Sequence, residues 1–511
     1  MTFKKIAVFL LVFIASASLL ILGIKGKSGD PVFYQSEVQT DKNIGGPFES
    51  SSSNSRFALV ESIAKERTFF FNEERAYFAA PDLVSYNGTF FSIFTPGVSF
   101  LGVPLYLLGA KIGFAQLATY SLNIIAGLLN IFLVYKLSRK LGAGAYSSLF
   151  SGTAFVFATH ALVYAFTLSQ HHISTALILF AILNAIGKRT LVKDITLGAA
   201  FGLGILMDIP NVFMMAPVIL YAFSRSIKVE DLGEKTKLVV KLTVLSFLIG
   251  VIPFLATFSW YNYKLTGSYL KIGQLIGRSD FPVKEENKAT LVIDQESSEL
   301  RLLEVPFNPR RMLEGLPLLI ASNERGILFY SPITAFGIAG LILAVKSKNQ
   351  QQKTASTLAS SVIFSNLLIY GMFGDPWGGW SFGPRYLVPT AAILCAGIGP
   401  IIERFKRKII FLILLALITT YSIFVNTLGA LTSTQVPPKV EAQALQNPIP
   451  HTYIYNWHLT ENKFSGSLIY NLYFSNIIPA QIYLLLFSSL SLFFMVLIFS
   501  AAYKEKPIID K

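Results

Sequence analysis

Cysteine and charge are the two things this sequence has little of. Cys395 is the single cysteine among 511 residues, so no disulfide can form within one chain. It lies in an apolar run, where the role of a small buried hydrophobic residue is the simplest interpretation. Charged residues make up 14% of the chain, whereas soluble domains carry about a quarter. The shortage of charge argues against an ordinary soluble domain.

The charge that is present is mainly basic, with 43 Lys and Arg against 29 Asp and Glu, a formal net charge of +14. A nucleic-acid-binding protein would gather such residues on a polar domain. Here they form short clusters at the ends of apolar runs, as at 136–140 and 404–408. We therefore interpret the basic residues as determinants of membrane topology and expect no nucleic-acid partner.

Apolar and aromatic residues are abundant. Hydrophobic residues make up 53% of the chain, with 43 Phe and 22 Tyr, and the mean hydropathy is +0.54. The sequence predicts an all-α polytopic membrane protein with about twelve transmembrane helices. The runs lie near 6–24, 117–135, 145–166, 172–187, 194–210, 211–226, 240–260, 327–345, 356–373, 386–402, 408–428 and 480–502.

The first run follows Lys4 and Lys5. A cleaved signal peptide is an open alternative, because Ala15, Ser16 and Ala17 are small residues of the kind found at cleavage sites. The run continues through Leu22 and is long enough to span, so we favour an uncleaved first helix. Placing every basic cluster inside puts both termini in the cytoplasm of a multi-pass plasma-membrane protein.

The apolar run 93–112 does not fit this alternation. An odd number of crossings must separate the outer segment after residue 24 from the basic cluster 136–140, and the run 117–135 supplies one. The run also contains Pro96 and Pro104. We expect a juxtamembrane or re-entrant helix at the outer surface.

This topology predicts a single transmembrane domain, 1–511, with three large outer segments at about 25–116, 261–326 and 429–479. All five histidines then lie outside or in the outer half of a span. The chain is therefore expected to work at the outer face.

The outer segment 374–386 has an unusual composition, with Asp375, Trp377, Trp380, four glycines and Arg385. Glycine permits close backbone approach, and an arginine fork suits a phosphate. The alternative is an interfacial aromatic anchor with an arginine at the headgroups. A second arginine, Arg325, precedes a further span; it is either a phosphate ligand or a plain flank.

Two further features lie at predicted span ends. Asp208 sits between two short spans, where a carboxylate is either functional or a solvated outer turn. His171 and His172 are adjacent, so on a helix they point to different faces and should not chelate together. The sequence identifies no cofactor with certainty; a divalent cation stays open, but the ligand spacing does not support one.

Three stretches resemble motifs of the membrane glycosyltransferases of the GT-C fold, which include protein O-mannosyltransferases and aminoarabinose transferases. They are Tyr86-Asn87-Gly88-Thr89-Phe90-Phe91-Ser92 followed by Thr95-Pro96-Gly97, the stretch from Trp377 to Tyr386, and the stretch from Arg325 to Pro332. The first also reads as a turn on its own. The likeness to the family extends in order over nearly the whole chain.

The resemblance implies a GT-C-like bundle with outer juxtamembrane helices that moves a sugar from a polyprenyl-phosphate donor to a lipid, glycan or protein acceptor. An acidic residue of the first outer loop would activate the acceptor hydroxyl, and cations would stabilise the departing phosphate. Arg385, Arg325 and Arg56 are the donor-binding candidates. The pocket candidates are Asp375, Trp377, Trp380, Asp208, Tyr86, Asn87 and His171.

One departure concerns the base. Relatives carry an Asp-Glu pair shortly before a motif that Arg56-Phe57-Ala58 matches, but Ser53 and Asn54 stand in its place. Neither is a base of carboxylate strength. We expect Asp82 to take the role first and Glu49 second.

Two other functions stay open. A transporter or flippase of lipid-linked glycans would suit about twelve spans, although the sequence lacks the two related halves common in transporters. A non-catalytic relative that binds lipid carriers would suit the missing acids. Donor consumption discriminates among the three.

Overall fold

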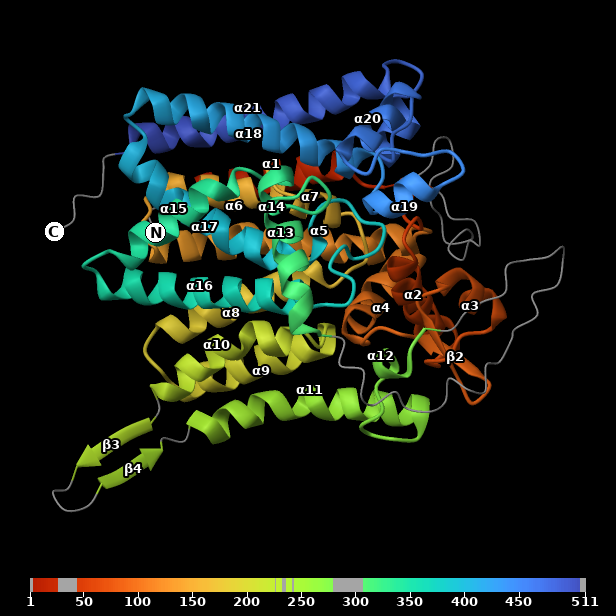
Figure 1. Cartoon of the computed structure of the whole chain (residues 1–511), viewed down its shortest axis with the longest axis horizontal. Coiled ribbons are helices and arrows are strands. Elements are labelled where there is room, and N and C mark those ends of the chain that lie inside the picture. Colours follow the sequence, from red (N-terminus) through yellow and green to blue (C-terminus); the bar gives the residue numbers. More distant parts are fainter. Residues whose placement is uncertain are drawn as a thin grey trace.

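The apolar runs predicted to span the membrane are helical over most of their length in the computed structural model, which describes residues 3–25, 44–225, 227–231, 236–240, 243–278 and 307–505. The helices lie side by side as one bundle (Figure 1). Their bounds are α1 Phe3–Leu22, α5 Ala115–Lys140, α6 Ala145–Phe157, α8 His171–Ile186, α9 Leu191–Met207, α10 Asn211–Ser224, α11 Thr243–Thr266, α15 Thr334–Val345, α16 Gln350–Gly371, α17 Val388–Phe405, α18 Ile409–Leu431 and α21 Ala480–Lys504.

Length and composition alone qualify five candidate spans in the described ranges, on α5, α11, α17, α18 and α21. Five shorter apolar helices accompany them, on α1, α4, α8, α10 and α15. The bundle therefore fits the predicted fold class, an all-α multi-pass membrane protein, and is compatible with about twelve crossings.

Two of the predicted spans are interrupted rather than continuous. The run 145–166 divides into α6 and a short α7, Ala161–Tyr164, and the run 327–345 divides into α14, Ile327–Tyr330, and α15. The two interruptions meet inside the bundle, where the His160 backbone N–H donates to Ser331 Oγ at 3.0 Å. Irregular backbone at this depth requires such internal partners. Pro332, which lacks a backbone N–H, stands in the second interruption.

Small residues set the closest helix contacts. A Cβ on Gly340 of α15 would lie 1.7 Å from the Gly397 carbonyl oxygen of α17, so only glycine allows this approach. Gly198 of α9 and Phe247 of α11 are similarly close, with a Cβ 2.0 Å from the Phe247 oxygen. Membrane helices, which gain little from the hydrophobic effect among themselves, pack through such small residues.

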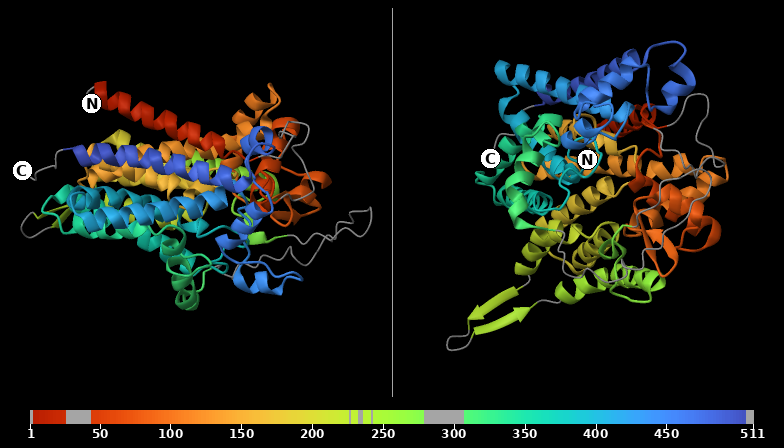
Figure 2. Two further views of the ribbon diagram at one scale, coloured as in Figure 1. Left: turned by 90° about the horizontal axis from the view of Figure 1, so that it is seen from above. Right: turned by 45° about the vertical axis from the view of Figure 1, so that its right-hand side comes forward.

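A cap of short elements covers one end of the bundle (Figures 1 and 2). It contains α2 Ser51–Glu61, the π-helical turn η2 Ser62–Glu66, α3 Glu73–Ala79, β1 Leu83–Tyr86, β2 Thr89–Ser92 and α4 Gly97–Ala110. Its core is aromatic: the Phe48 ring packs on Phe57, Phe78 and Tyr120 with centroids 5.2–6.3 Å apart.

The predicted turn at Asn87-Gly88 is confirmed as the tip of an antiparallel hairpin. β1 and β2 pair from Leu83↔Ser92 to Tyr86↔Thr89. Asn87 and Gly88 have φ of 49° and 75°. Positive φ at both central residues is the two-residue turn that Asn-Gly favours, because it matches the strand twist.

Helix α4 corresponds to the run 93–112. Its 14 residues reach about 21 Å, less than the hydrocarbon thickness of about 30 Å. It lies at the cap end of the bundle beside α2 (Figure 1). This length and place agree with a helix that does not cross, which stays a prediction.

The remaining elements complete the two ends. At the cap end lie α12 Gly273–Ile276, α19 Lys439–Ala444 and α20 Tyr453–Glu461; at the other end lie the hairpin β3 Ile227–Asp231 and β4 Thr236–Val240 and both ends of the chain (Figure 1). The structure also contains the 3₁₀ turns η4 Pro309–Arg311 and η5 Arg385–Leu387, α13 Met312–Ile320 and the π-helical turn η6 Tyr470–Phe474.

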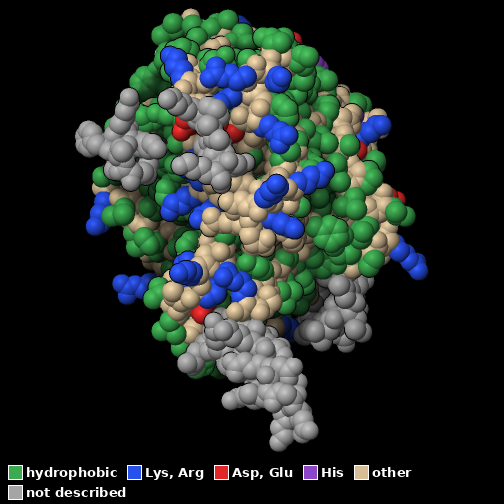
Figure 3. Space-filling view, turned by 90° about the vertical axis from the view of Figure 1, so that its left-hand side faces the viewer, with side chains coloured by type: hydrophobic (Ala, Val, Ile, Leu, Met, Phe, Trp, Pro, Cys, Tyr) green, Lys and Arg blue, Asp and Glu red, His purple; other side chains and the backbone are tan. Residues whose placement is uncertain are grey.

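The end that carries the termini is rich in lysine and arginine and shows few acidic side chains (Figure 3). This is the distribution that the positive-inside rule predicts for a cytoplasmic end.

Candidate functional site

A polar cavity of about 280 Å³ lies under the cap. It forms where the start of α2, the start of α8 and the loop 374–384, here called the tryptophan loop, come together. Its lining is mostly hydroxyl, amide and aromatic: Ser50, Ser52, Ser53, Tyr164, Thr167, Ser169, His171, Trp380, Ser381, Arg385, Thr434 and Gln435.

Arg385 supplies the cation of this cavity. Arg385 is the first residue of η5, directly after the tryptophan loop. A Cβ on Gly378 (φ 71°) would lie 2.6 Å from Arg385 Nε, so a glycine at this position lets the loop approach the arginine this closely. The contact of Arg385 with Tyr386 Oη is long, at 3.5 Å. In the described ranges Arg385 Nε is buried without a hydrogen-bond partner. An enclosed guanidinium with spare donors is suited to an anion.

Arg325 also contacts this loop, and hydrogen bonds to backbone carbonyl groups hold its guanidinium group. It is 0% exposed. Its N–H groups donate to the carbonyl oxygens of Trp377 (2.8 Å), Glu324 (2.8 Å), Gly379 (3.0 Å) and Val436 (2.9 Å). These bonds brace the tryptophan loop, and the structure does not place Arg325 among the residues that line the cavity.

Arg56 approaches the site from α2. Its NH1 and NH2 groups donate to Ser52 O and Gln170 Oε1, each at 2.8 Å. Its guanidinium carbon stands 3.8 Å from the centre of the Phe94 ring. Burial lowers the pKa of Arg56 to about 10, which still leaves it protonated at neutral pH; nearby Asp208 and Asp82 oppose this lowering and Arg385 adds to it. Arg56 and Arg385 therefore share one electrostatic environment.

Asp208 joins this group through an amide. Gln170 Nε2 donates to Asp208 Oδ2 at 3.0 Å, and the other end of the amide accepts from Arg56. Burial raises the pKa of Asp208, while Arg56 and the Gln170 hydrogen bond limit the rise. Asp208 is thus half-buried in the molecule and held by the site, rather than a freely solvated turn.

Asp82 is brought to the start of α2 from the cap. It is 3% exposed. Its Oδ2 accepts from Ser51 Oγ at 2.8 Å, and its Oδ1 lies 2.8 Å from NH2 of Arg278, a side chain that is 62% exposed. Asp82 also interacts electrostatically with Arg385. A carboxylate therefore stands at the beginning of the helix in which Ser53 and Asn54 replace the acids of the resembling family.

Glu49 occupies a different and fully bonded environment. Its Oε2 accepts from Gly45 N (2.6 Å) and Ser433 Oγ (2.7 Å), and its Oε1 accepts from Thr434 N (2.9 Å) and Thr434 Oγ1 (2.7 Å). Lys25 Nζ lies 3.9 Å away and donates to Thr432 O. This arrangement ties the segment after α1, the start of the cap and the loop after α18 together, and gives each carboxylate oxygen two hydrogen-bond donors.

His171 and His172 point to different faces of α8, as predicted. His171 lines the cavity and packs on Tyr164 with ring centroids 5.2 Å apart. His172 faces the bundle core, where its Nε2 is 2.8 Å from Ala161 O. Among the described residues no group of three or more His, Cys, Asp or Glu is placed to hold a metal ion.

The other sequence candidates divide between the cavity and the cap surface. Trp380 lines the cavity and donates from Nε1 to Glu441 at 2.6 Å. Trp377 donates to Glu324 at 3.0 Å, and exposed Asp375 accepts from Gly378 N at 3.1 Å within the tryptophan loop. At the hairpin, Tyr86 Oη accepts from Lys271 Nζ at 2.9 Å and Asn87 is exposed.

Sequence reasoning missed three contributors. Gln170 links Arg56 to Asp208, Ser50, Ser52 and Ser53 line the cavity, and Arg278 pairs with Asp82. The serine run was visible in the sequence, but its placement at the mouth of a cavity depends on the fold of the cap. Gln170 directly precedes the two histidines, which was its only local signal.

Known proteins support the fold and part of the resemblance. Residues 102–260 match the family described as dolichyl-phosphate-mannose-protein mannosyltransferase. The crystal structure of ArnT from Cupriavidus metallidurans bound to undecaprenyl phosphate is similar over 98% of this chain and 77% of that chain, with 14% identity and a TM-score of 0.52. The archaeal oligosaccharyltransferase AglB from Archaeoglobus fulgidus aligns over 88% of this chain and 60% of that chain, with 12% identity and a TM-score of 0.46.

No curated protein sequence matches the chain. The family match covers 102–260, which lies outside the three motif stretches, and the structural likeness extends across almost the whole chain. The resemblance to membrane glycosyltransferases is thereby confirmed, and this chain has the GT-C fold that ArnT also has.

Proposed function

We propose that this protein is a glycosyltransferase that moves a sugar from a polyprenyl-phosphate donor to an acceptor hydroxyl at the outer face of the plasma membrane. The observation that carries the proposal is Arg385, an enclosed guanidinium with an unpartnered Nε that lines a polar cavity. A phosphate would supply the acceptor atoms that this fork lacks. The GT-C fold, and the undecaprenyl phosphate bound to ArnT, support a lipid phosphate as the ligand.

The donor phosphate would sit between Arg385 and the hydroxyls of Ser50, Ser52 and Ser53. Helix α2 begins at Ser51, so the positive end of its dipole faces the same place. Arg56 adds a second positive charge close by. These groups would stabilise the negative charge that develops on the phosphate as it departs.

Asp82 would act as the general base. The acceptor hydroxyl attacks the anomeric carbon, its proton passes to the Asp82 carboxylate, and the bond from that carbon to the phosphate oxygen breaks. The electron pair leaves with the polyprenyl phosphate, which Arg385 then faces. Asp82 is favoured over Glu49 because Glu49 already accepts four hydrogen bonds, and over Asp208 because Asp82 stands at the start of α2.

Asp208 and Arg325 would act on other residues rather than on substrate. Asp208 holds Gln170, which holds Arg56, so it positions a cation. Arg325 fixes the tryptophan loop that leads into Arg385. His171, Trp380 and Tyr164 would shape the sugar-binding wall of the cavity.

The test is a donor-consumption assay with the full chain in liposomes and a panel of polyprenyl-phosphate-linked sugars. Release of polyprenyl phosphate together with glycosylated acceptor is the expected result for at least one donor. Movement of intact donor across the bilayer would instead establish a flippase. Donor binding with neither movement nor turnover would establish a non-catalytic carrier-binding protein.

A further inference from the structure

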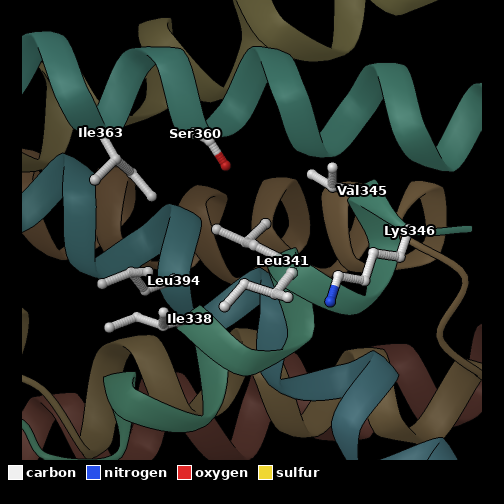
Figure 4. Close-up of a pocket in the computed structure, with 8 residues that line it drawn as sticks. Ile338, Leu341, Val345, Lys346, Ser360, Ile363 and Leu394 are labelled. Atoms are coloured by element: carbon white, nitrogen blue, oxygen red, sulfur yellow. The ribbon is translucent and has the colours of Figure 1, made fainter.

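A second and larger hollow lies between α15, α16 and α17, on elements that contribute little to the cavity under the cap. Its volume is about 750 Å³. The lining is aliphatic apart from one hydroxyl and one amine: Ile338, Leu341, Ile342, Val345, Lys346, Ser360, Ile363 and Leu394. Figure 4 shows the aliphatic side chains converging on the space from the three helices, with Lys346 at one end of it.

Glycine packing accounts for the shape of this groove. Gly337 and Gly340 press α15 onto α17, with a Cβ on Gly337 only 1.9 Å from the Leu394 carbonyl oxygen. Helix α15 therefore packs closely against α17, and α16 lies on the opposite side of the groove (Figure 4). Leu394 of α17 lines the groove between α15 and α16. On the rim, Ile338 and Ile342 are 43% and 50% exposed. An apolar groove between membrane helices is suited to bind a hydrocarbon chain.

The charge at one end of the groove is positive. The segment 346–353 has three lysines and no acidic residue. Lys346 is exposed, and the described part of the chain offers it no ion pair. The α15–α16 connection lies toward the basic end that carries both termini (Figures 1 and 3), which the positive-inside rule assigns to the cytoplasm. Basic pockets between helices on that side suit anionic lipid headgroups.

We propose that this groove binds one anionic glycerophospholipid of the cytoplasmic leaflet, with an acyl chain along Leu341, Ile363 and Leu394 and its phosphate against Lys346. The aliphatic lining selects a hydrocarbon chain, and the lysine selects negative charge at the headgroup. The site lies at the opposite end of the bundle from Arg385 and does not depend on the proposed transfer reaction.

The test is native mass spectrometry of the full chain, titrated with phosphatidylglycerol and with phosphatidylcholine that carry the same acyl chains. Wild-type protein should retain one phosphatidylglycerol about fivefold more tightly than phosphatidylcholine, the size expected for one lysine near an anionic surface. K346A should lose this preference and K346R should keep it. S360F, whose ring would fill the groove, should weaken both lipids.

K188A is the matched control, because Lys188 is an exposed lysine in the α8–α9 loop and does not line the groove. It should bind both lipids as the wild type does. Equal binding of the two lipids by wild-type protein, or an unchanged preference in K346A, overturns the proposal. The proposal would also be overturned if polyprenyl phosphate bound this site more tightly than phosphatidylglycerol, because the groove would then have a different ligand.

Discussion

Arg325 and Arg385 flank the same glycine-rich loop, but their donors are used differently. Arg325 donates to four backbone carbonyls, whereas Arg385 Nε has no partner in the described ranges. Both were predicted from sequence as phosphate ligands because arginine beside glycine and aromatic residues favours that role. The difference depends on carbonyl groups contributed by Gly379 and Val436, which lie far from Arg325 in the sequence. Local sequence cannot supply that information.

Replacing the proposed base should remove activity without unfolding the protein. We expect D82N to lower kcat by about 10²–10⁴-fold, the contribution typical of a general base. An asparagine can still accept the hydrogen bond from Ser51, and Arg278 is largely exposed to solvent, so the substitution should cost little stability. Initial rates and thermal unfolding midpoints of purified protein check this. D208N is the comparison and should lose less activity, since Asp208 acts through Gln170; a D82N rate within threefold of wild type would remove Asp82 from the mechanism.

Glu49 should behave in the opposite way. In E49Q an amide nitrogen would face donors that now bond to a carboxylate oxygen, and Lys25 would lose its counter-charge. A buried group left unsatisfied costs about 1–3 kcal/mol, and an uncompensated charge adds to this. We expect a clear drop in the thermal unfolding midpoint, with the remaining folded protein still active. An unchanged midpoint with lost turnover would instead favour Glu49 as the base.

At the scale of elements, sequence patterns predicted the structure correctly where neighbouring residues determine it. The turn at Asn87-Gly88 and the opposite faces of His171 and His172 were predicted and observed, whereas the two strands that flank the turn were not predicted. The interruptions after α6 and α14 were not predicted, because each depends on a hydrogen-bond partner from the other. An apolar run shows that a segment can enter the bundle, not that it stays helical throughout.

The α15–α17 contact offers a test of packing. G340A adds a methyl group where a Cβ would meet the Gly397 carbonyl oxygen at 1.7 Å, so the helices must separate. Overpacking of this kind costs about 1–3 kcal/mol, and we expect a lower thermal unfolding midpoint. A339V is the control, because Ala339 is exposed on the same helix. Equal midpoints for G340A and wild type would mean that the two helices are not held together at Gly340.

At the scale of the whole molecule, the two ends of the bundle differ in charge and in the elements that they carry. Both chain ends and a basic surface lie at one end, and the cap with its cavity lies at the other (Figures 1 and 3). The positive-inside rule predicted this separation from the sequence, because basic clusters alternate with apolar runs. The sequence suggested residues for a pocket, but it could not predict that α2, α8 and the tryptophan loop meet to form it.

The placement of α4 can be tested by topology mapping. If α4 lies on the outer surface, a reporter fused after residue 115, beyond its C-terminal end, should be accessible from outside the cell. Reporters after residues 142 and 505 should be cytoplasmic and serve as controls. A cytoplasmic signal after residue 115 would make α4 a true span and would shift the predicted alternation.

The most direct measurement of the central claim is the steady-state transfer rate of R385A, with R385K and R311A beside it. Arg311 is an exposed arginine that bonds to Gly374 O at the edge of the same loop, so R311A controls for loss of a nearby charge. We predict that R385A lowers kcat by about 10²–10³-fold, because the departing phosphate loses its preorganised donor, that R385K recovers part of the loss, and that R311A resembles wild type. An R385A rate within twofold of wild type would contradict the account.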